Sequence, residues 1–259
     1  MRFDYMKSNE KITALIAARM GSSRFPGKTL EDLHGMPMLS QLIERIKASN
    51  YVNDLVVATT DLNQDKDIEE WCKQNEIGCY RGSADDVLGR LTSAAKYFNC
   101  STVVEVLGDN PLVHCELIDS CLIKYFSGDY DYVATLTDEY PKVDISLKRF
   151  PIGVRVQVMS LETLKKCSKL TSEERHREHA TSFIAENPKI FKTSFIEAKG
   201  KFELCNRPEL TFAVNEKKNL NLVREIFSIC YKNNKNFTLN DIINAFDDNP
   251  HLKVDMGNS

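Results

Sequence analysis

Long apolar runs, basic blocks and paired cysteines are all missing from this sequence of 259 residues. No run approaches the roughly 20 apolar residues of a membrane-spanning helix, so we expect no membrane contact. The net charge is -3 without a long basic block, which argues against a nucleic-acid partner. Eight cysteines occur without a CxxC pair, and this distribution predicts reduced thiols in a cytoplasmic protein and argues against structural zinc.

Internal repeats, low-complexity tracts and a secretory signal are absent as well. The hydrophobic fraction of 42% and the charged fraction of 27% are typical of a globular protein. We expect a flexible lead-in over residues 1–10, a single domain over 11–248 and a loose polar tail over 249–259.

Apolar runs alternate with helical patterns through the first half of the chain. The sequence predicts strands at 12–18, 55–59, 79–81, 102–107 and 131–135, and helices at 37–49, 65–75, about 83–98 (capped by Ser83 or Asp85) and 116–126. Strands that alternate with helices at this spacing indicate an α/β fold with a parallel sheet.

The segment 136–152 breaks this pattern, and we interpret the excursion 136–160 as a lid or a dimer arm. Further strands are predicted at 152–159, 191–198 and 210–214, and helices at 160–170, from about 171 to just before Pro188, at 216–232 and at 239–246.

A cationic loop follows the first strand and reads Ala17-Ala18-Arg19-Met20-Gly21-Ser22-Ser23-Arg24-Phe25-Pro26-Gly27-Lys28-Thr29. Glycine and serine allow backbone N–H groups to converge on a phosphate, and the cationic side chains match a triphosphate. A P-loop has four residues between its glycines, whereas here five separate Gly21 from Gly27, Pro26 among them. The loop therefore predicts a nucleotide-phosphate site that is not a P-loop.

Asp109 follows the predicted strand at 102–107. Because ligands bind beyond the carboxyl ends of parallel strands, Asp109 and the cationic loop should meet at one edge of the sheet. Alone, Asp109 would be a turn residue before Asn-Pro. Opposite a cationic loop, its carboxylate predicts a Mg²⁺ ligand.

Three other groups leave alternatives open. The run from Arg175 to His179 is either a solvated charged helix or part of a site. Asp129-Tyr130-Asp131 looks like a glycosyltransferase metal motif, but it precedes a strand and is interpreted as a loop. His114 follows the Gly-Asp-Asn-Pro-Leu turn and could touch a substrate or serve the structure only.

Five motifs occur in the order found in the cytidylyltransferases: ARMGSSRFPGK (18–28), DDVLGRLTSAAK (85–96), GDNPL (108–112), PIGVRVQVMS (151–160) and REHATSFIAENP (177–188). Over about 10–230 the chain resembles the spore-coat polysaccharide (SpsF-like) type and, more distantly, the CMP-Kdo and CMP-acylneuraminate synthetases. The resemblance implies a three-layer α/β/α nucleotidyltransferase fold of the GT-A-like, Rossmann-like kind, usually a homodimer.

The resemblance also implies the activity, transfer of CMP from CTP to a sugar, sugar acid or similar polar acceptor for surface polysaccharide. It assigns to the nucleotide Ala17, Ala18, Arg19, Met20, Gly21, Ser22, Arg24, Lys28, Arg81, Ser83, Asp86 and Asp109, of which Arg19, Lys28 and Asp109 would be catalytic. It places Arg177, Glu178 and His179 near the acceptor. Arg155 could face the acceptor or a dimer partner, or be a plain surface residue.

One departure from the family pattern concerns Mg²⁺. Relatives usually carry two aspartates near the C-terminal end, where this chain has Asn215 and Asn219. Asn215 could still ligate metal through its carbonyl oxygen. The enzyme could instead be a non-catalytic nucleotide-binding homologue, and a GT-A glycosyltransferase that uses a nucleotide sugar is a further alternative.

Overall fold

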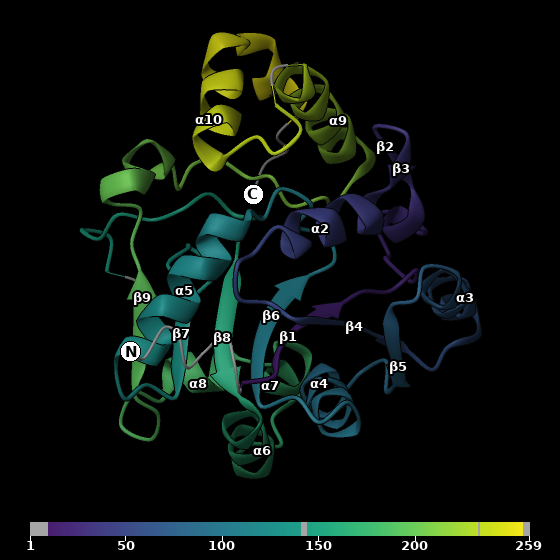
Figure 1. The fold of residues 1–259 in the computed structure, drawn as a ribbon, viewed down its shortest axis with the longest axis vertical. Helices are drawn as coiled ribbons and strands as arrows, with labels where there is room; N and C mark the ends of the chain where they lie inside the picture. Colours follow the sequence, from purple (N-terminus) through teal and green to yellow (C-terminus); the bar gives the residue numbers. More distant parts are fainter. Residues whose placement is uncertain (1–9, 141–143, 233, 256–259) are drawn as a thin grey trace.

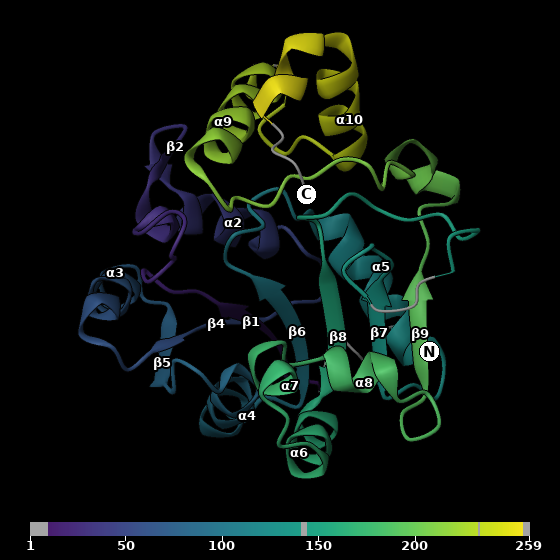
Figure 2. The same cartoon turned by 180° about the vertical axis from the view of Figure 1, so that it is seen from behind.

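The computed structural model describes residues 10–140, 144–232 and 234–255. Its centre is a seven-stranded sheet with the strand order β5-β4-β1-β6-β8-β7-β9 (Figures 1 and 2). Within this sheet of the described chain, β8 alone runs antiparallel to its neighbours, so the predicted α/β fold with a mainly parallel sheet is confirmed. The strands are β1 (Ile12–Ala17), β4 (Asp54–Thr60), β5 (Gly78–Gly82), β6 (Thr102–Leu107), β7 (Tyr132–Thr135), β8 (Val156–Ser160) and β9 (Thr193–Ile196), and a separate hairpin joins β2 (Asp32–Leu33) to β3 (Met36–Pro37).

Helices cover both faces of the sheet and complete the three layers. One face carries α2 (Met38–Lys47) and α5 (Cys115–Ser127), and the other carries α4 (Val87–Tyr97), α6 (Leu161–Leu170), α7 (Glu174–Glu178) and α8 (Ser182–Glu186) (Figures 1 and 2). The helix α3 (Lys66–Gln74) flanks the β5 edge, and α9 (Lys217–Tyr231) packs beside α10 (Leu239–Asp248). Short 3-10 turns are η1 (Lys28–Leu30), η2 (Asn63–Asp65), η3 (Gly200–Cys205) and η4 (Pro250–Asp255).

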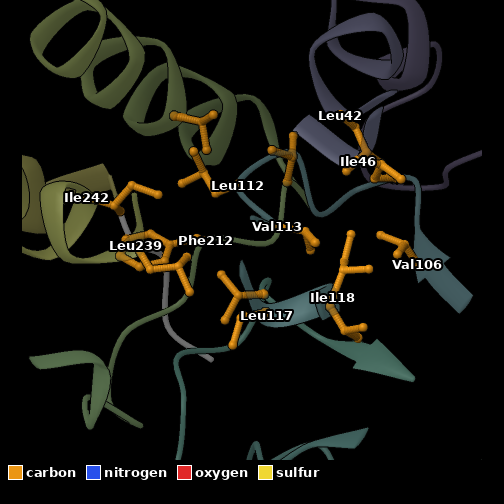
Figure 3. Close-up of a cluster of buried hydrophobic side chains, with 14 of the residues drawn as sticks. Leu42, Ile46, Val106, Leu112, Val113, Leu117, Ile118, Phe212, Leu239 and Ile242 are labelled. Carbon is orange, nitrogen blue, oxygen red and sulfur yellow. The ribbon is translucent and has the colours of Figure 1, made fainter. Parts of the chain in front are cut away.

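The sheet separates two hydrophobic clusters. Val104 and Val106 of β6 face the larger cluster and Val103 faces the smaller one. Burial on both faces explains the continuous apolar strand sequences. In the larger cluster α2, α5, β6 and α10 contribute side chains that pack together (Figure 3), among them Leu42, Ile46, Val106, Leu112, Val113, Leu117, Ile118, Phe212, Leu239 and Ile242.

The carboxyl ends of β1 and β6 lie very close to each other. A Cβ atom on Gly108 would come within 2.9 Å of the Ala17 carbonyl oxygen, so the residue after β6 must be glycine. The Gly108 N–H donates to that same oxygen at 2.8 Å. This contact brings Asp109 beside the start of the cationic loop.

One of the predicted helix caps is confirmed and another is wrong. Ser160 caps α6 as predicted, because its hydroxyl accepts the Thr163 N–H at 3.0 Å. The cap of α4 is Asp86, which accepts the Gly89 N–H at 2.7 Å, and not Ser83 or Asp85.

The prediction of one helix from about 171 to Pro188 is wrong. The chain forms α7 and α8, and the backbone of His179 between them is not helical. The break is held by tertiary contacts: the Thr181 hydroxyl donates to Gln157, and the Cys167 thiol donates to the Ala180 carbonyl at 3.7 Å.

Two other segments differ from their predictions. Residues 210–214 form only an isolated bridge between Ile152 and Thr211. The N–H groups of Phe212 and Val214 donate to the carbonyls of Ile152 and Asp109, which lie outside the strands of the sheet. The start of the expected loose tail is the 3-10 turn η4, which buries Leu252. The remainder, 256–259, and the lead-in 1–9 lie outside the described residues.

The described parts of the excursion, 136–140 and 144–155, contain no helix or regular strand, and β8 begins later than predicted. Tyr140 and Phe150 are nevertheless buried, and the Phe150 N–H donates to the Leu136 carbonyl at 2.8 Å. The segment is therefore seated on the domain, and its role as a lid or a dimer arm stays a prediction. Among the helices described, none has the length and apolar character needed to span a membrane.

Candidate active site

A cleft of about 340 Å³ opens at the carboxyl ends of β1 and β6. The cationic loop forms one wall, β6 with its following turn forms the floor, and α4, the end of α7 and Asn215 close the rest. The lining residues are Ala17, Ala18, Arg19, Ser22, Ser23, Arg24, Lys28, Thr29, Val87, Arg90, Leu107, Gly108, Asp109, Glu178, His179 and Asn215. Loop and carboxylate therefore meet at one sheet edge, as the parallel topology predicts.

The loop is braced by hydrogen bonds of its own backbone. The N–H groups of Ser22 and Gly27 both donate to the Met20 carbonyl at 2.9 Å, and the Met20 N–H donates to Asp65 at 2.6 Å. Gly27 has φ of 80°, which favours glycine at this turn. The expectation that the loop's N–H groups converge on phosphate is therefore wrong for Ser22 and Gly27, whose N–H groups are occupied within the loop.

Three cations of the loop line the cleft in two different ways. Arg19 and Arg24 are exposed on the loop. Lys28 is buried, and its Nζ donates to the Val214 carbonyl at 2.6 Å and to Asp109 Oδ2 at 3.0 Å. The ammonium group thus links η1, the β6 turn and the 210–215 segment at one point.

The 210–215 segment reaches the cleft by pairing with the β6 turn. The Val214 N–H donates to the Asp109 carbonyl at 2.9 Å, which leaves Asn215 on the cleft wall. Asn219, by contrast, caps α9: its Oδ1 accepts the N–H of Asn215 at 3.2 Å and of Glu216 at 2.9 Å. Of the two asparagines that replace acidic residues, only Asn215 faces the cleft.

Arg90 is a cleft residue that the sequence analysis did not assign. It lies one turn after the α4 cap Asp86, inside the motif at 85–96, and its place in that motif was the available signal. Its Nη1 donates to the Ser83 carbonyl, whereas its Nε has no partner among the described residues. Burial, and then the nearby Arg19, lower the pKa of Arg90.

The predicted acceptor residues are divided by the structure. Glu178 and His179 line the cleft, because α7 ends there. Arg177 points elsewhere: its guanidinium donates to the Ser168 hydroxyl at 2.9 Å and to the Ser168 carbonyl at 3.0 Å, and it lies 3.4 Å from Asp86. Arg177 therefore joins α6 to the α4 cap outside the cleft lining, and its assignment to the acceptor stays a prediction.

Some predicted nucleotide residues also lie outside the cleft lining. Arg81 bonds to the Thr60 and Leu62 carbonyls and to Glu69 at 2.9 Å, so it supports the β4–β5 edge. Ser83 accepts the Asp86 N–H at 3.1 Å, and both residues serve the start of α4. Met20 and Gly21 shape the loop without lining the cleft.

Arg155 lies beside the cleft floor, inside a buried polar cluster. Val156 pairs with Val106, so Arg155 is next to the cleft residue Leu107. Its guanidinium is 3.5 Å from Glu139 and 5.6 Å from the ring centre of Tyr140.

Unpartnered atoms and one shifted pKa mark the same cluster. Arg155 Nε, Glu105 Oε2 and Gln157 Nε2 are buried without hydrogen-bond partners in the described chain. Burial raises the pKa of Glu105 to about 7, and Arg155 opposes this rise. A plain surface role for Arg155 is therefore wrong.

The glycosyltransferase alternative loses its metal motif. Asp129 pairs with Lys192, and Asp131 accepts the Lys192 N–H at 2.9 Å, so both residues tie the start of β7 to the segment before β9. Because β7 runs parallel to β6, this is the edge of the sheet opposite the cleft. Within the described chain, no group of three or more His, Cys, Asp or Glu residues could hold a metal ion.

A family model described as cytidylyltransferase matches residues 13–242. The chain belongs to the cytidylyltransferase family. This cytidylyltransferase is accordingly a CTP-dependent nucleotidyltransferase, and the resemblance drawn from its motifs is confirmed.

The alignments with two relatives cover most of the chain. It is 32% identical to an uncharacterised protein of Methanocaldococcus jannaschii over 94% of this chain and 93% of the relative. It is 28% identical to the spore coat polysaccharide biosynthesis protein SpsF of Bacillus subtilis over 83% of this chain and 86% of that protein.

Solved structures show the same fold. A cytidylyltransferase from Leptospira borgpetersenii superposes with a TM-score of 0.84 and 25% identity, covering 97% of this chain and 99% of that chain. A CMP:2-keto-3-deoxy-manno-octonic acid synthetase solved with CTP has a TM-score of 0.61 at 18% identity, with 85% and 99% of the two chains covered, which supports the fold alone.

Proposed function

We propose that this cytidylyltransferase transfers CMP from CTP to a small polar acceptor, a sugar or sugar acid, in the biosynthesis of surface polysaccharide. In this reaction an acceptor hydroxyl oxygen bonds to the α-phosphorus and releases its proton to water, the bond from that phosphorus to the bridging oxygen breaks, and pyrophosphate leaves. The observation that carries the proposal is the cleft in which Arg19, Arg24 and Lys28 face Asp109. The names of SpsF and of a 3-deoxy-manno-octulosonate cytidylyltransferase relative (32% identical over 60% of this chain) support the acceptor class.

The chain's own groups would act mainly by positioning and charge neutralisation, which dominate phosphoryl-type transfers. Arg19 and Arg24 are exposed in the cleft and would bind the triphosphate. Lys28, fixed by the Val214 carbonyl, presents its ammonium group from the floor of the loop. These charges stabilise the leaving pyrophosphate.

Mg²⁺ belongs to the proposal, and the donor set fits it. The Asp109 carboxylate and the Asn215 amide oxygen line one cleft, and Mg²⁺ prefers oxygen ligands with one or two carboxylates and substrate phosphates. When bound, the ion would supply positive charge to the phosphates. Homodimerisation stays a prediction that rests on the resemblance, and a cytoplasmic location stays a prediction that rests on the cysteine distribution.

The acceptor would bind toward Glu178 and His179, which line the cleft at the end of α7. Arg155 lies behind the cleft floor with its Nε buried, so it would support this region without direct contact with the acceptor. The name of the 3-deoxy-manno-octulosonate cytidylyltransferase relative favours a sugar acid as the acceptor.

The test measures CTP binding by calorimetry and pyrophosphate release over a panel of sugars and sugar acids with Mg²⁺. We expect CTP binding, turnover with at least one acceptor, and loss of turnover in Asp109→Asn with the fold retained. A protein that does not bind CTP would contradict the proposal.

Asn215 supports one second candidate, a CTP-binding homologue without catalysis, because it removes a charge that a metal ligand would carry. CTP binding without turnover for any acceptor, also in Asn215→Asp, would favour this candidate. Turnover by the unmodified chain would exclude it.

A further inference from the structure

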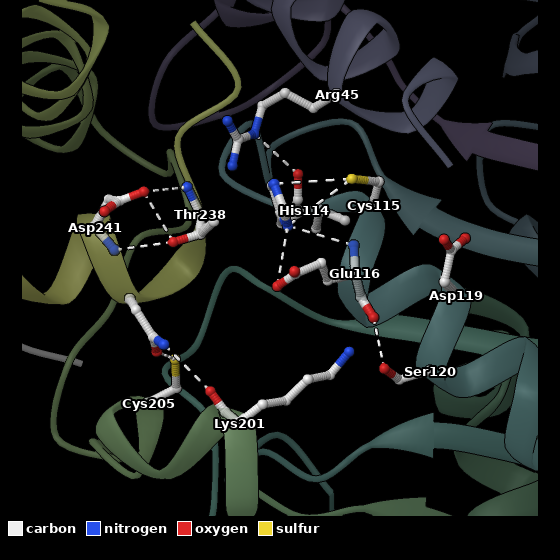
Figure 4. Close-up of polar contacts among 12 residues, drawn as sticks. Arg45, His114, Cys115, Glu116, Asp119, Ser120, Lys201, Cys205, Thr238 and Asp241 are labelled. Atoms are coloured by element: carbon white, nitrogen blue, oxygen red, sulfur yellow. Dashed lines mark hydrogen bonds and ion pairs between the residues drawn. The ribbon is translucent and has the colours of Figure 1, made fainter. Parts of the chain in front are cut away.

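A second cavity, of about 270 Å³, lies between α2, the start of α5 and the end of α9. It shares no lining residue with the nucleotide cleft, and it is formed by Met36, Gln41, Glu44, Arg45, Ala48, His114, Phe227, Tyr231, Lys235 and Asn236. His114, which the sequence placed near the substrate, lines this cavity because it caps α5 by accepting the Glu116 N–H. Figure 4 shows Arg45 above His114 at this place.

The central feature of the cavity is the cation of Arg45. The residue is 8% exposed, and no described carboxylate forms an ion pair with it. Burial lowers the pKa of Arg45 to about 10. A buried charge without a counter-ion is costly, so an anion at this position would be stabilised.

One edge of the guanidinium is used by the protein and part of it is free. Nε donates to the Val113 carbonyl at 3.0 Å, Nη2 approaches the Leu112 carbonyl at 3.5 Å, and the ring of Phe237 lies 4.2 Å from Cζ. Nη1 has no partner among the described residues and is not among the fully buried atoms. It is available as a hydrogen-bond donor to a ligand.

The other residues that line the cavity indicate which kind of anion it would bind. Lys235 adds a second cation at the exposed rim, and the rim carboxylate of Glu44 is already 3.0 Å from Lys47. Phe227 and Tyr231 give an aromatic wall, with their ring centres 5.7 Å apart. At 270 Å³ the cavity lies just below the roughly 300–1,000 Å³ of drug-sized ligand sites.

We propose that this cavity binds a small carboxylate with an aromatic or apolar body, with the carboxylate on Arg45 Nη1 and the body against Phe227 and Tyr231. The site is separate from the nucleotide cleft and does not depend on the proposed reaction.

Benzoate is the probe, and benzamide is the neutral probe of the same shape. The readout is the ¹³C-labelled methyl signal of Met36, which lines the cavity, compared with that of Met20 in the cleft loop. We expect benzoate to shift Met36 and leave Met20 unchanged, with an affinity at least tenfold above that of benzamide. Equal affinity for the two probes, or a shift at Met20 alone, would overturn the proposal.

Three variants sharpen the test. Arg45→Met should abolish the preference for benzoate. Lys235 is exposed, so Lys235→Glu should leave the fold intact. It should weaken the binding of benzoate severalfold and make that binding less dependent on salt concentration. Arg224→Gln is the matched control, because Arg224 also donates to a backbone carbonyl, that of Asp32, outside the cavity, and it should bind as the unmodified protein does. Retained preference in both Arg45→Met and Lys235→Glu would refute the site.

Discussion

Replacement of Lys28 by methionine tests the centre of the nucleotide cleft. The change keeps the length and apolar stem of the side chain and removes an ammonium group that bonds to the Val214 carbonyl and to Asp109. Two effects should follow, one on folding and one on CTP, and the structure assigns them different sizes.

The effect on folding should be moderate. A hydrogen bond to a charged group contributes about 1.5–3 kcal/mol when buried, but the Asp109 side chain is 27% exposed and water screens the charge that remains. We expect the free energy of unfolding to fall by about 1–2 kcal/mol in a urea titration. The protein should remain folded.

The effect on CTP should be larger. A hydrogen bond to a charged group such as a triphosphate contributes about 1.5–3 kcal/mol, which corresponds to a loss of roughly 10–10²-fold in affinity. We therefore expect Lys28→Met to weaken CTP binding by up to about 10²-fold in calorimetry.

Lys11→Met is the matched control for this experiment. Lys11 also bonds one backbone carbonyl, that of Phe98 at 2.6 Å, and one carboxylate, that of Asp54 at 3.0 Å, but it does not line the cleft. Its substitution should leave CTP affinity unchanged. If folded Lys28→Met binds CTP within threefold of the unmodified protein, the assignment of Lys28 to the triphosphate is wrong.

Three further predictions concern stability. Burial raises the pKa of Glu105 to about 7 from an unfolded value near 4.5, so its contribution to stability is present below about pH 4.5 and is lost as the pH rises through 7. Between pH 4.5 and 8, the free energy of unfolding from urea titrations should fall by about 3 kcal/mol less in Glu105→Gln than in the unmodified protein. An equal fall in both proteins would contradict the burial argument. Arg177→Ala should lower the free energy of unfolding by about 1–3 kcal/mol by releasing Ser168, with the KM for the acceptor unchanged; a raised acceptor KM in the folded variant would return Arg177 to the acceptor site. Asn219→Ala should cost about 1 kcal/mol by removing an α9 cap while Asn219→Asp retains the cap, and equal stabilities by thermal unfolding would count against this role.

The strands were predictable where both faces are buried. The prediction at 102–107 coincides with β6, and the prediction at 12–18 exceeds β1 by one residue. Because both faces of such a strand are buried, nearly all of its side chains are apolar, and the continuous apolar run predicts the strand. The parallel topology then places Asp109 beside the cationic loop, and this geometry was predictable as well.

The unpredicted features depend on contacts between distant residues. Nothing local in 174–186 opposes a continuous helix, and the break comes from a bond between Thr181 and Gln157, which are 24 positions apart. Arg90 and Arg177 both lie inside the quoted motifs, at 85–96 and 177–188, yet only Arg90 lines the cleft, because the Arg177 guanidinium bonds to Ser168. Membership of a motif therefore did not determine which arginine faces the cleft.

Asn215 changes the charge of the cleft as well as its metal ligands. Among the described lining residues, four cations (Arg19, Arg24, Lys28 and Arg90) face two carboxylates, those of Asp109 and Glu178. An aspartate at position 215 would attract Mg²⁺ and repel the triphosphate, so asparagine weakens the metal site and strengthens the direct attraction for CTP at the same time. The affinity for CTP without Mg²⁺ should consequently be higher in the unmodified chain than in Asn215→Asp, whereas added Mg²⁺ should increase the affinity of the variant more. Calorimetry with and without the ion measures both quantities, and a variant that binds CTP more tightly in the absence of Mg²⁺ would show that position 215 does not face the phosphates.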